Sequence, residues 1–172
     1  MKLLVNSLPQ NIKSIVPLHY SKITSKSSTW DIQKSLSQSN IDMLWRMVST
    51  AVKENGVGLA APQVGLMKHL FIILNEDDNK NSYSAYFNPT FVKEGSNKIS
   101  GIEGCLSVPN GLYEVDRYEK IIATWYEPES LEPGASFVRR EKLLEGYISR
   151  VFQHEHQHLS GISIASVGKR IK

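Results

Sequence analysis

An amphipathic helix is predicted near residue 41, where apolar residues recur at helical spacing. These residues are Ile41, Leu44, Met47, Val48, Ala51 and Val52. Asn40 is the candidate N-cap, and Asn55-Gly56 is the expected end, because both residue types accept the left-handed backbone that follows a helix. The pattern therefore predicts one apolar helix face directed at a core.

Short apolar runs separated by turn residues follow this helix and predict β-strands. The expected strands lie at about residues 69–74, 84–88, 98–102, 112–117, 120–126 and 136–141. Asp77-Asp78-Asn79 and Glu132-Pro133-Gly134 are candidate turns between them. A second helix is expected at about residues 144–159, where Ile148, Val151, Phe152, Glu155 and Leu159 share a stripe and Gly161 can end the run. A helix, several antiparallel strands and a helix form an α+β pattern.

The composition indicates an ordinary globular domain. The chain has 172 residues, of which 41% are hydrophobic, so it can bury a core of its own. No apolar run approaches the length that crosses a membrane. The formal net charge of +3 is small, and the basic residues are not interleaved with aromatic ones. Specific nucleic-acid binding is therefore not expected. Residues 1–30 hold four lysines and no acidic residue, and we expect this stretch to be irregular, with strand character around Leu3–Val5.

The sequence His154-Glu155-His156-Gln157-His158 places two histidines four residues apart on the second predicted helix. Such residues differ by about 40° around an α-helix, so the imidazoles of His154 and His158 point from one face. Glu155 stands beside them and can act as a base on water activated by a metal. His156 lies about 200° from His154 and is expected to be solvated or to support the site rather than to bind the metal. The pattern indicates metal-assisted hydrolysis, although an exposed helix face can carry the same residues.

A third ligand must lie upstream of this helix. Catalytic four-coordinate sites take three protein ligands and leave one position for water. Residues 159–172 contain no His, Cys, Asp or Glu, which excludes the two common metalloprotease arrangements. Cys105 is the only cysteine, so it forms no internal disulfide and favours a reducing compartment. A thiolate with two imidazoles suits zinc or iron(II), and a buried core thiol is the alternative of equal weight.

Residues 56–65, Gly-Val-Gly-Leu-Ala-Ala-Pro-Gln-Val-Gly, form another candidate motif. A nucleotide loop is disfavoured, because no Lys-Ser/Thr follows and no strand-turn-helix unit is evident. Beside a metal, Gly56 and Gly58 would let the backbone approach a bound peptide. The Gln63 amide could donate a hydrogen bond to a developing oxyanion.

Together these segments resemble the peptide deformylase family. Residues 56–63 match its Gly-x-Gly-x-Ala-Ala-x-Gln motif, residues 103–107 match Glu-Gly-Cys-Leu-Ser, and Val115-x-Arg117 also agrees. The histidine motif matches from Gln153 to Gly161, except that Gln157 stands where the family usually has Asp. The resemblance runs from about residue 41 to 162 and implies short antiparallel sheets around a central metal-binding helix. We therefore expect a single catalytic domain over 1–172, with an arm at 1–40, a deformylase-like core at 41–162 and a short basic tail at 163–172.

The resemblance implies a role for each motif residue. Cys105, His154 and His158 would hold one divalent metal, with Fe²⁺ expected and Zn²⁺, Ni²⁺ or Co²⁺ as alternatives. Glu155 would transfer protons, while the Gln63 side chain and the backbone N–H of Leu106 would stabilise the oxyanion.

Substrate positions follow from the same resemblance. The backbone at Gly58 and Gly104 matches peptide-binding positions, since an extended peptide can pair through main-chain hydrogen bonds. Val57 and Val151 match the pocket for the methionine side chain, although Val151 could equally be an ordinary core residue. Tyr147 and Arg150 stand near this pocket with weaker support.

The implied reaction removes the formyl group from the N-terminal formylmethionine of nascent peptides and releases formate. A related metallohydrolase of different acyl or peptide specificity is one alternative. A non-enzymatic relative that binds nascent chains is another, but a structural metal site would need neither Glu155 nor Gln63. We expect a cytoplasmic or organellar protein that is not secreted and does not bind membranes. The excess of basic residues allows transient contact with a ribosome, although a plain solvated surface is the simpler interpretation. The sequence does not indicate an oligomeric state.

Overall fold

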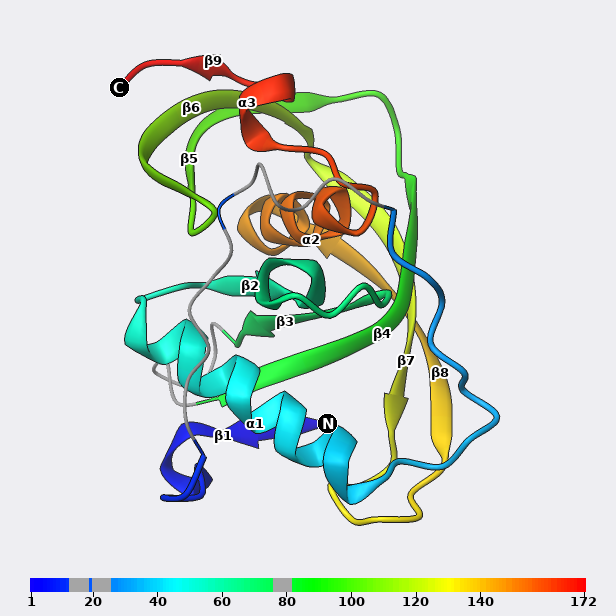
Figure 1. The fold of residues 1–172 in the computed structure, drawn as a ribbon. Helices are drawn as coiled ribbons and strands as arrows, with labels where there is room; N and C mark the ends of the chain where they lie inside the picture. Colours follow the sequence, from blue (N-terminus) through cyan, green and yellow to red (C-terminus); the bar gives the residue numbers. More distant parts are fainter. Residues whose placement is uncertain (13–18, 20–25, 76–81) are drawn as a thin grey trace.

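Two antiparallel sheets and two long helices make up the fold (Figure 1). The structure, a computed structural model, describes residues 1–12, 19, 26–75 and 82–172. In chain order the elements are β1 Lys2–Leu4, the 3-10 helix η1 Val5–Ser7, α1 Gln38–Lys53, β2 Gly58–Ala60, the 3-10 helix η3 Ala61–Val64, β3 Leu70–Leu74, β4 Ser82–Lys93, β5 Lys98–Cys105, β6 Val108–Tyr118, β7 Lys120–Pro128, β8 Phe137–Glu145, α2 Gly146–Leu159, α3 Ile164–Val167 and β9 Lys169–Arg170. The mixed helix and antiparallel-sheet class is confirmed.

The larger sheet has the strand order β2-β3-β4-β7-β8, with β1 paired to β4. The smaller sheet has the order β5-β6-β9. Neighbouring strands in both sheets run antiparallel. β2 and β5 therefore each form an edge of their sheet.

Helix α2 lies between the two sheets, with β2 and β3 on one side and β5 and β6 on the other (Figure 1). Its apolar face is fixed by Phe152, whose ring meets those of Phe71 and Tyr86 edge-on at centroid distances of 5.0 and 5.5 Å. The helix begins at Gly146, two residues later than predicted, because β8 stays paired with β7 through Glu145. Its predicted end is confirmed, since Gly161 takes a left-handed backbone with φ 69° and donates its N–H to the carbonyl of His158.

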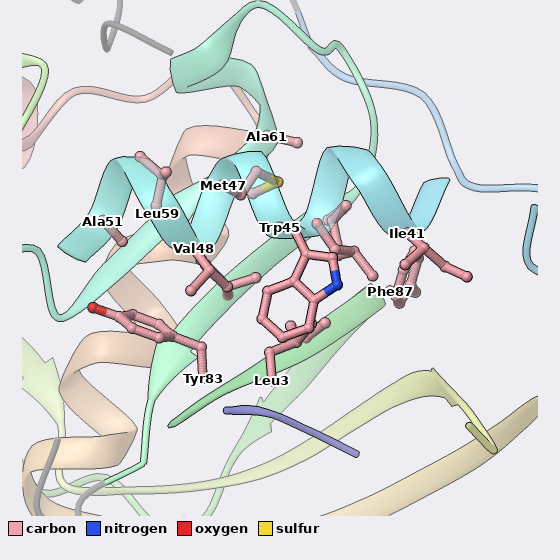
Figure 2. Close-up of a cluster of buried hydrophobic side chains, with 14 of the residues drawn as sticks. Leu3, Ile41, Trp45, Met47, Val48, Ala51, Leu59, Ala61, Tyr83 and Phe87 are labelled. Carbon is pink, nitrogen blue, oxygen red and sulfur yellow. The ribbon is translucent and has the colours of Figure 1, made fainter. Parts of the chain in front are cut away.

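Helix α1 packs its apolar face onto β1, β2 and β4 (Figure 2). Trp45 and Val48 face Leu3 and Tyr83 across this layer, and all four side chains are buried. The helix begins earlier than predicted, because the cap is Ser37 rather than Asn40.

The cap of α1 is a reciprocal pair. The Ser37 hydroxyl accepts from the Asn40 N–H, while the Asn40 side chain accepts from the Ser37 N–H. At the other end Asn55 takes the left-handed backbone with φ 53°, as predicted. No helix in the described part of the chain is long and apolar enough to span a membrane.

The N-terminal arm is tied to the body of the fold. Its predicted strand character is confirmed by β1. Farther along, the N–H and hydroxyl of Ser27 both donate to the Leu159 carbonyl, at 2.9 and 2.7 Å, and so satisfy the C-terminal end of α2. The Asn88 side chain bonds both the N–H and the carbonyl of Trp30, at 2.6 and 2.8 Å.

The predicted strands exist, but several are longer than the apolar runs that predicted them. β4 covers Ser82–Lys93 instead of 84–88, because it continues past Asn88. Asn88 has a φ of 47°, and the pairing register shifts between Phe87 and Thr90, so the strand is irregular there but does not end. β2 and β9 are too short to show a sequence period and were not predicted. The turn at Asp77-Asp78-Asn79 lies outside the described residues.

Candidate metal centre and active site

Three candidate metal ligands meet between β5 and α2. Cys105 ends β5, and His154 and His158 lie one turn apart on α2. Their candidate ligand atoms all lie within 4.8 Å of one another. His158 Nε2 is 3.4 Å from Cys105 Sγ and 3.3 Å from His154 Nε2. The structure thus brings together the three residues that the motifs nominated.

The spacing of these atoms fits a tetrahedral metal. Ligand bonds of about 2.0–2.1 Å to nitrogen and about 2.3 Å to sulfur would separate two nitrogens by about 3.3 Å and a nitrogen from sulfur by about 3.6 Å. His158 Nδ1 and Glu155 Oε2 are buried and have no hydrogen-bond partner among the described residues. One thiolate and two imidazoles form a donor set suited to zinc or iron(II). The residues present therefore fit a divalent ion.

Glu103 orients the first histidine ligand from behind. Its Oε2 lies 2.9 Å from His154 Nδ1, which leaves Nε2 directed at the other ligands. Arg117 donates two hydrogen bonds to the same carboxylate, at 3.0 and 2.8 Å. Burial alone would raise the pKa of Glu103, but the hydrogen bonds from Arg117 and His154 outweigh burial and lower its pKa to about 2. The Glu103 side chain is therefore an ionised carboxylate at neutral pH.

The two histidines have pKa values shifted in opposite directions. Burial lowers the pKa of His158 well below its usual value, so its imidazole is neutral, the form that binds metals. Burial also lowers the pKa of His154, but hydrogen bonds to Cys105 and Glu103 outweigh it and raise the pKa to about 10. A metal must therefore displace a proton from this site.

The Glu155 carboxylate lies against Gly58 of β2. A Cβ atom at Gly58 would collide with Glu155 Oε1, so the first glycine-rich motif makes room for this acid. Burial raises the pKa of Glu155 to about 7, while the charge of His154 acts in the opposite direction. A carboxyl group with this pKa can both accept and return a proton near neutral pH.

Gln63 reaches the metal centre from η3. Its side-chain oxygen accepts the Ala60 N–H at 2.8 Å, which fixes the amide nitrogen on the opposite side. That nitrogen donates to the Ser107 hydroxyl at 3.1 Å and lies 3.7 Å from Cys105 Sγ. The amide is thus an oriented donor beside the ligands.

A cavity of about 860 Å³ opens onto these groups. Its walls include every residue nominated for binding or oxyanion stabilisation: Val57, Gly58, Gln63, Gly104, Leu106 and Val151. Val57 is 39% exposed, whereas Val151 is 6% exposed and also packs in the core cluster of α2, so the pocket and core interpretations both describe it. The binding roles themselves stay predictions.

Arg150 and Tyr147, which the sequence placed near the pocket with weaker support, also line the cavity. Arg150 donates to Glu103 Oε1 at 2.7 Å, a contact that depends on a partner 47 residues away. Helical spacing was the available signal, since Arg150 lies one turn before His154. His156 lies away from the ligands, as predicted, and packs edge-on against Phe91 at 5.1 Å. Gln157 is half-buried beside the second ligand.

Comparison with known proteins agrees with this geometry. A family model described as polypeptide deformylase matches residues 12–172. A peptide deformylase of Thermotoga petrophila is 37% identical over 69% of this chain and 66% of its own length. One from Symbiobacterium thermophilum is 40% identical over 67% of this chain, but the aligned part is 49% of that relative. The chain thus aligns with less than two thirds of these relatives.

Solved structures show the same fold. A class I type b peptide deformylase from Acinetobacter baumannii superposes with a TM-score of 0.76 at 26% identity, covering 90% of this chain and 99% of the other. The peptide deformylase of Thermotoga maritima superposes with a TM-score of 0.75 at 28% identity, covering 90% and 97%.

Proposed function

The chain belongs to the polypeptide deformylase family, and from this premise we propose that it is a metal-dependent hydrolase of N-formylmethionyl peptides. It removes the formyl group from the N-terminal methionine and releases formate. One observation carries the proposal: Cys105, His154, Glu155 and an oriented Gln63 amide line a single cavity, and the His158 ligand atom lies within 4.8 Å of those of Cys105 and His154. A structural metal site needs neither the acid nor the amide.

Cys105, His154 and His158 would hold the metal. A divalent ion there lowers the pKa of a water molecule and polarises a carbonyl group. Fe²⁺ is the metal we propose, with Zn²⁺, Ni²⁺ or Co²⁺ as alternatives.

Glu155 carries the protons of the reaction. Its carboxylate accepts a proton from the attacking water and delivers it to the nitrogen of the departing amine, a role worth about 10²–10⁴ in rate. The raised pKa of about 7 supports both halves of this transfer. Glu155 Oε2 is buried without a partner among the described residues, so it is available to the water.

The oxyanion that forms on the formyl group is stabilised by the amide of Gln63 and the backbone N–H of Leu106. Gln63 is 2% exposed and its orientation is set by Ala60, so the donor is held in place before the reaction starts. Leu106 follows the cysteine ligand directly and lines the same cavity.

The peptide binds as an extended strand between the sheets. Gly58 lies on edge strand β2 and Gly104 on edge strand β5, and both line the cavity. Edge strands offer unpaired main-chain groups that bind many peptide sequences alike. The methionine side chain enters beside Val57 and Val151. The related Acinetobacter baumannii deformylase, 25% identical, has been crystallised with actinonin bound.

Transient contact with a ribosome and a cytoplasmic or organellar location remain part of the proposal. The first test is a formate assay on the protein purified without oxygen, using formyl-Met-Ala-Ser and measuring metal content in parallel. Formate release that disappears with a chelator and returns with Fe²⁺ would support the function. Hydrolysis of internal peptide bonds without formate release would favour a metallohydrolase of other specificity.

A further inference from the structure

Arg150 separates two cavities. The active-site cavity of about 860 Å³ and a second cavity of about 270 Å³ share Arg150 and Tyr147 as lining residues. The second cavity is otherwise lined by Ile99, Ser100, Arg117, Tyr118, Glu119 and Gly146. Tyr147 is 51% exposed, whereas the Arg150 side chain is 14% exposed, so the arginine is the buried part of the partition.

The Arg150 guanidinium is held from three directions. Its Nη1 donates to Glu103 Oε1 at 2.7 Å and to the Val115 carbonyl at 2.9 Å, and its Nη2 donates to the Ile99 carbonyl. Charge-assisted bonds to a carboxylate are stronger than neutral ones. The side chain therefore forms a fixed wall rather than a mobile surface group.

Gly101 provides the space for this wall. Ile99, Gly101 and Glu103 alternate along β5 and share one face of the strand. A Cβ atom at Gly101 would lie 2.8 Å from Arg150 Cζ and 2.9 Å from Nη2, too close for a real contact. The guanidinium thus occupies the position that a side chain at residue 101 would take.

We propose that Arg150 is a specificity-determining residue that closes the methionine side-chain pocket and limits the length of the side chain it accepts. The inference rests on the proposed function, because it takes the first residue of the peptide to enter beside Val57 and Val151. Arg150 and Val151 line the same active-site cavity, and Arg150 also lines the second one, so its guanidinium stands where a side chain entering beside Val151 would pass into the second cavity. Without the guanidinium, the pocket extends into the second cavity.

The test compares two substrates in each variant. One is formyl-Met-Ala-Ser, and the other carries 2-aminooctanoic acid, which has a longer unbranched side chain, in place of methionine. The ratio of their kcat/KM values cancels any effect of Arg150 on Glu103 and the ligands, because such an effect slows both substrates alike. Arg150→Ala should shift the ratio toward the longer side chain by about tenfold or more, since one methylene in an apolar pocket is worth about 10–200-fold.

Arg139→Ala is the matched control, because Arg139 is an exposed arginine on β8 that bonds Glu141 and Thr124 on the larger sheet. Its ratio should equal that of the parent chain. Gly101→Ala displaces the guanidinium without removing it, so it should change the ratio in the parent but not in the Arg150→Ala background. An unchanged ratio in folded Arg150→Ala, or equal effects of Gly101→Ala in both backgrounds, would contradict the proposal that Arg150 limits the pocket.

A binding measurement separates this inference from the proposed function. The dissociation constants of the two unformylated peptides, measured on metal-loaded protein, give the same ratio without turnover. If no formate is released but the binding ratio shifts in Arg150→Ala, the proposed function is rejected and the role of Arg150 in the pocket stands. If formate is released but neither ratio shifts, the function stands and the role of Arg150 is rejected.

Discussion

His154 and Glu103 are joined by a contact of 2.9 Å between Nδ1 and Oε2, and this contact determines how the metal centre is built. Glu103 lies on β5, the strand that ends at Cys105, and His154 lies on α2, the helix that also carries His158. The carboxylate also binds Arg117 and Arg150, so it links the two sides of the centre. Both ligand orientation and fold stability should depend on this one side chain.

Glu103→Gln should therefore reduce both metal affinity and stability. Removing an outer partner of a histidine ligand typically weakens metal binding by about 10–100-fold. Leaving the buried Arg117 without its counter-charge should cost about 3–5 kcal/mol in the free energy of unfolding. Metal titration and urea unfolding measure the two effects. Glu141→Gln is the control, since its pair with Arg139 is exposed and worth about 0–1 kcal/mol. Equal stabilities of the two variants would contradict the account.

Glu103 should also make the metal-free protein sensitive to acid. Its pKa is lowered from 4.5 to about 2 on folding, so between these values the unfolded chain binds more protons than the folded one. The stabilisation is complete above about pH 4.5 and is lost as the pH falls toward 2. Urea midpoints of the parent and of Glu103→Gln should converge as the pH drops through this window. A constant difference across it would show that Glu103 is not the titrating group.

Gln63→Ala should slow formate release with little effect on metal binding. Loss of one oxyanion donor typically costs about 10²–10³ in kcat. The Ser107 hydroxyl, which accepts from Gln63 Nε2 at 3.1 Å, offers the matched comparison. Ser107→Ala removes a group that orients the amide and should cost less. Both losses are measured as kcat on formyl-Met-Ala-Ser. A larger loss in Ser107→Ala than in Gln63→Ala would show that Gln63 is not the oxyanion donor.

Gln157→Asp tests the one departure from the family motif. Gln157 directly precedes the ligand His158 and is half-buried. A carboxylate there would add a negative charge near the ligands, so we expect activity to persist with a moderate change in metal affinity or rate. Metal titration and kcat/KM together measure this change. Loss of activity in Gln157→Asp would mean that the amide is required.

Local periodicity predicted the parts of the molecule that depend on local physics. The 3.6-residue repeat placed His154 and His158 on one helix face, and the left-handed residues Asn55 and Gly161 marked helix ends. Donor chemistry left Cys105 open between a metal ligand and a core thiol and made the Gln63 amide a candidate donor, and the motif resemblance then implied both roles.

The remaining features depend on contacts between distant segments. Asn88-Pro89 reads as a strand end, yet β4 continues through it because pairing with β7 resumes at Thr90. The position of Arg150 could not be read from the sequence, because it requires an absent side chain at Gly101 and a carboxylate at Glu103, both on strand β5 and more than 40 residues away along the chain. Ser37 rather than Asn40 caps α1, and the sequence alone did not decide between them because both residue types are favourable N-caps.

The central claim is that Glu155 transfers the protons of a deformylation reaction at a metal held by Cys105, His154 and His158. The most direct test is formate release from formyl-Met-Ala-Ser by Glu155→Gln, with metal content measured on the same sample. Glutamine keeps the shape of the side chain beside Gly58 but cannot accept the proton. We predict a full complement of metal and a rate lower by about 10²–10⁴ or more. Unchanged formate release in the metal-loaded variant would contradict the account.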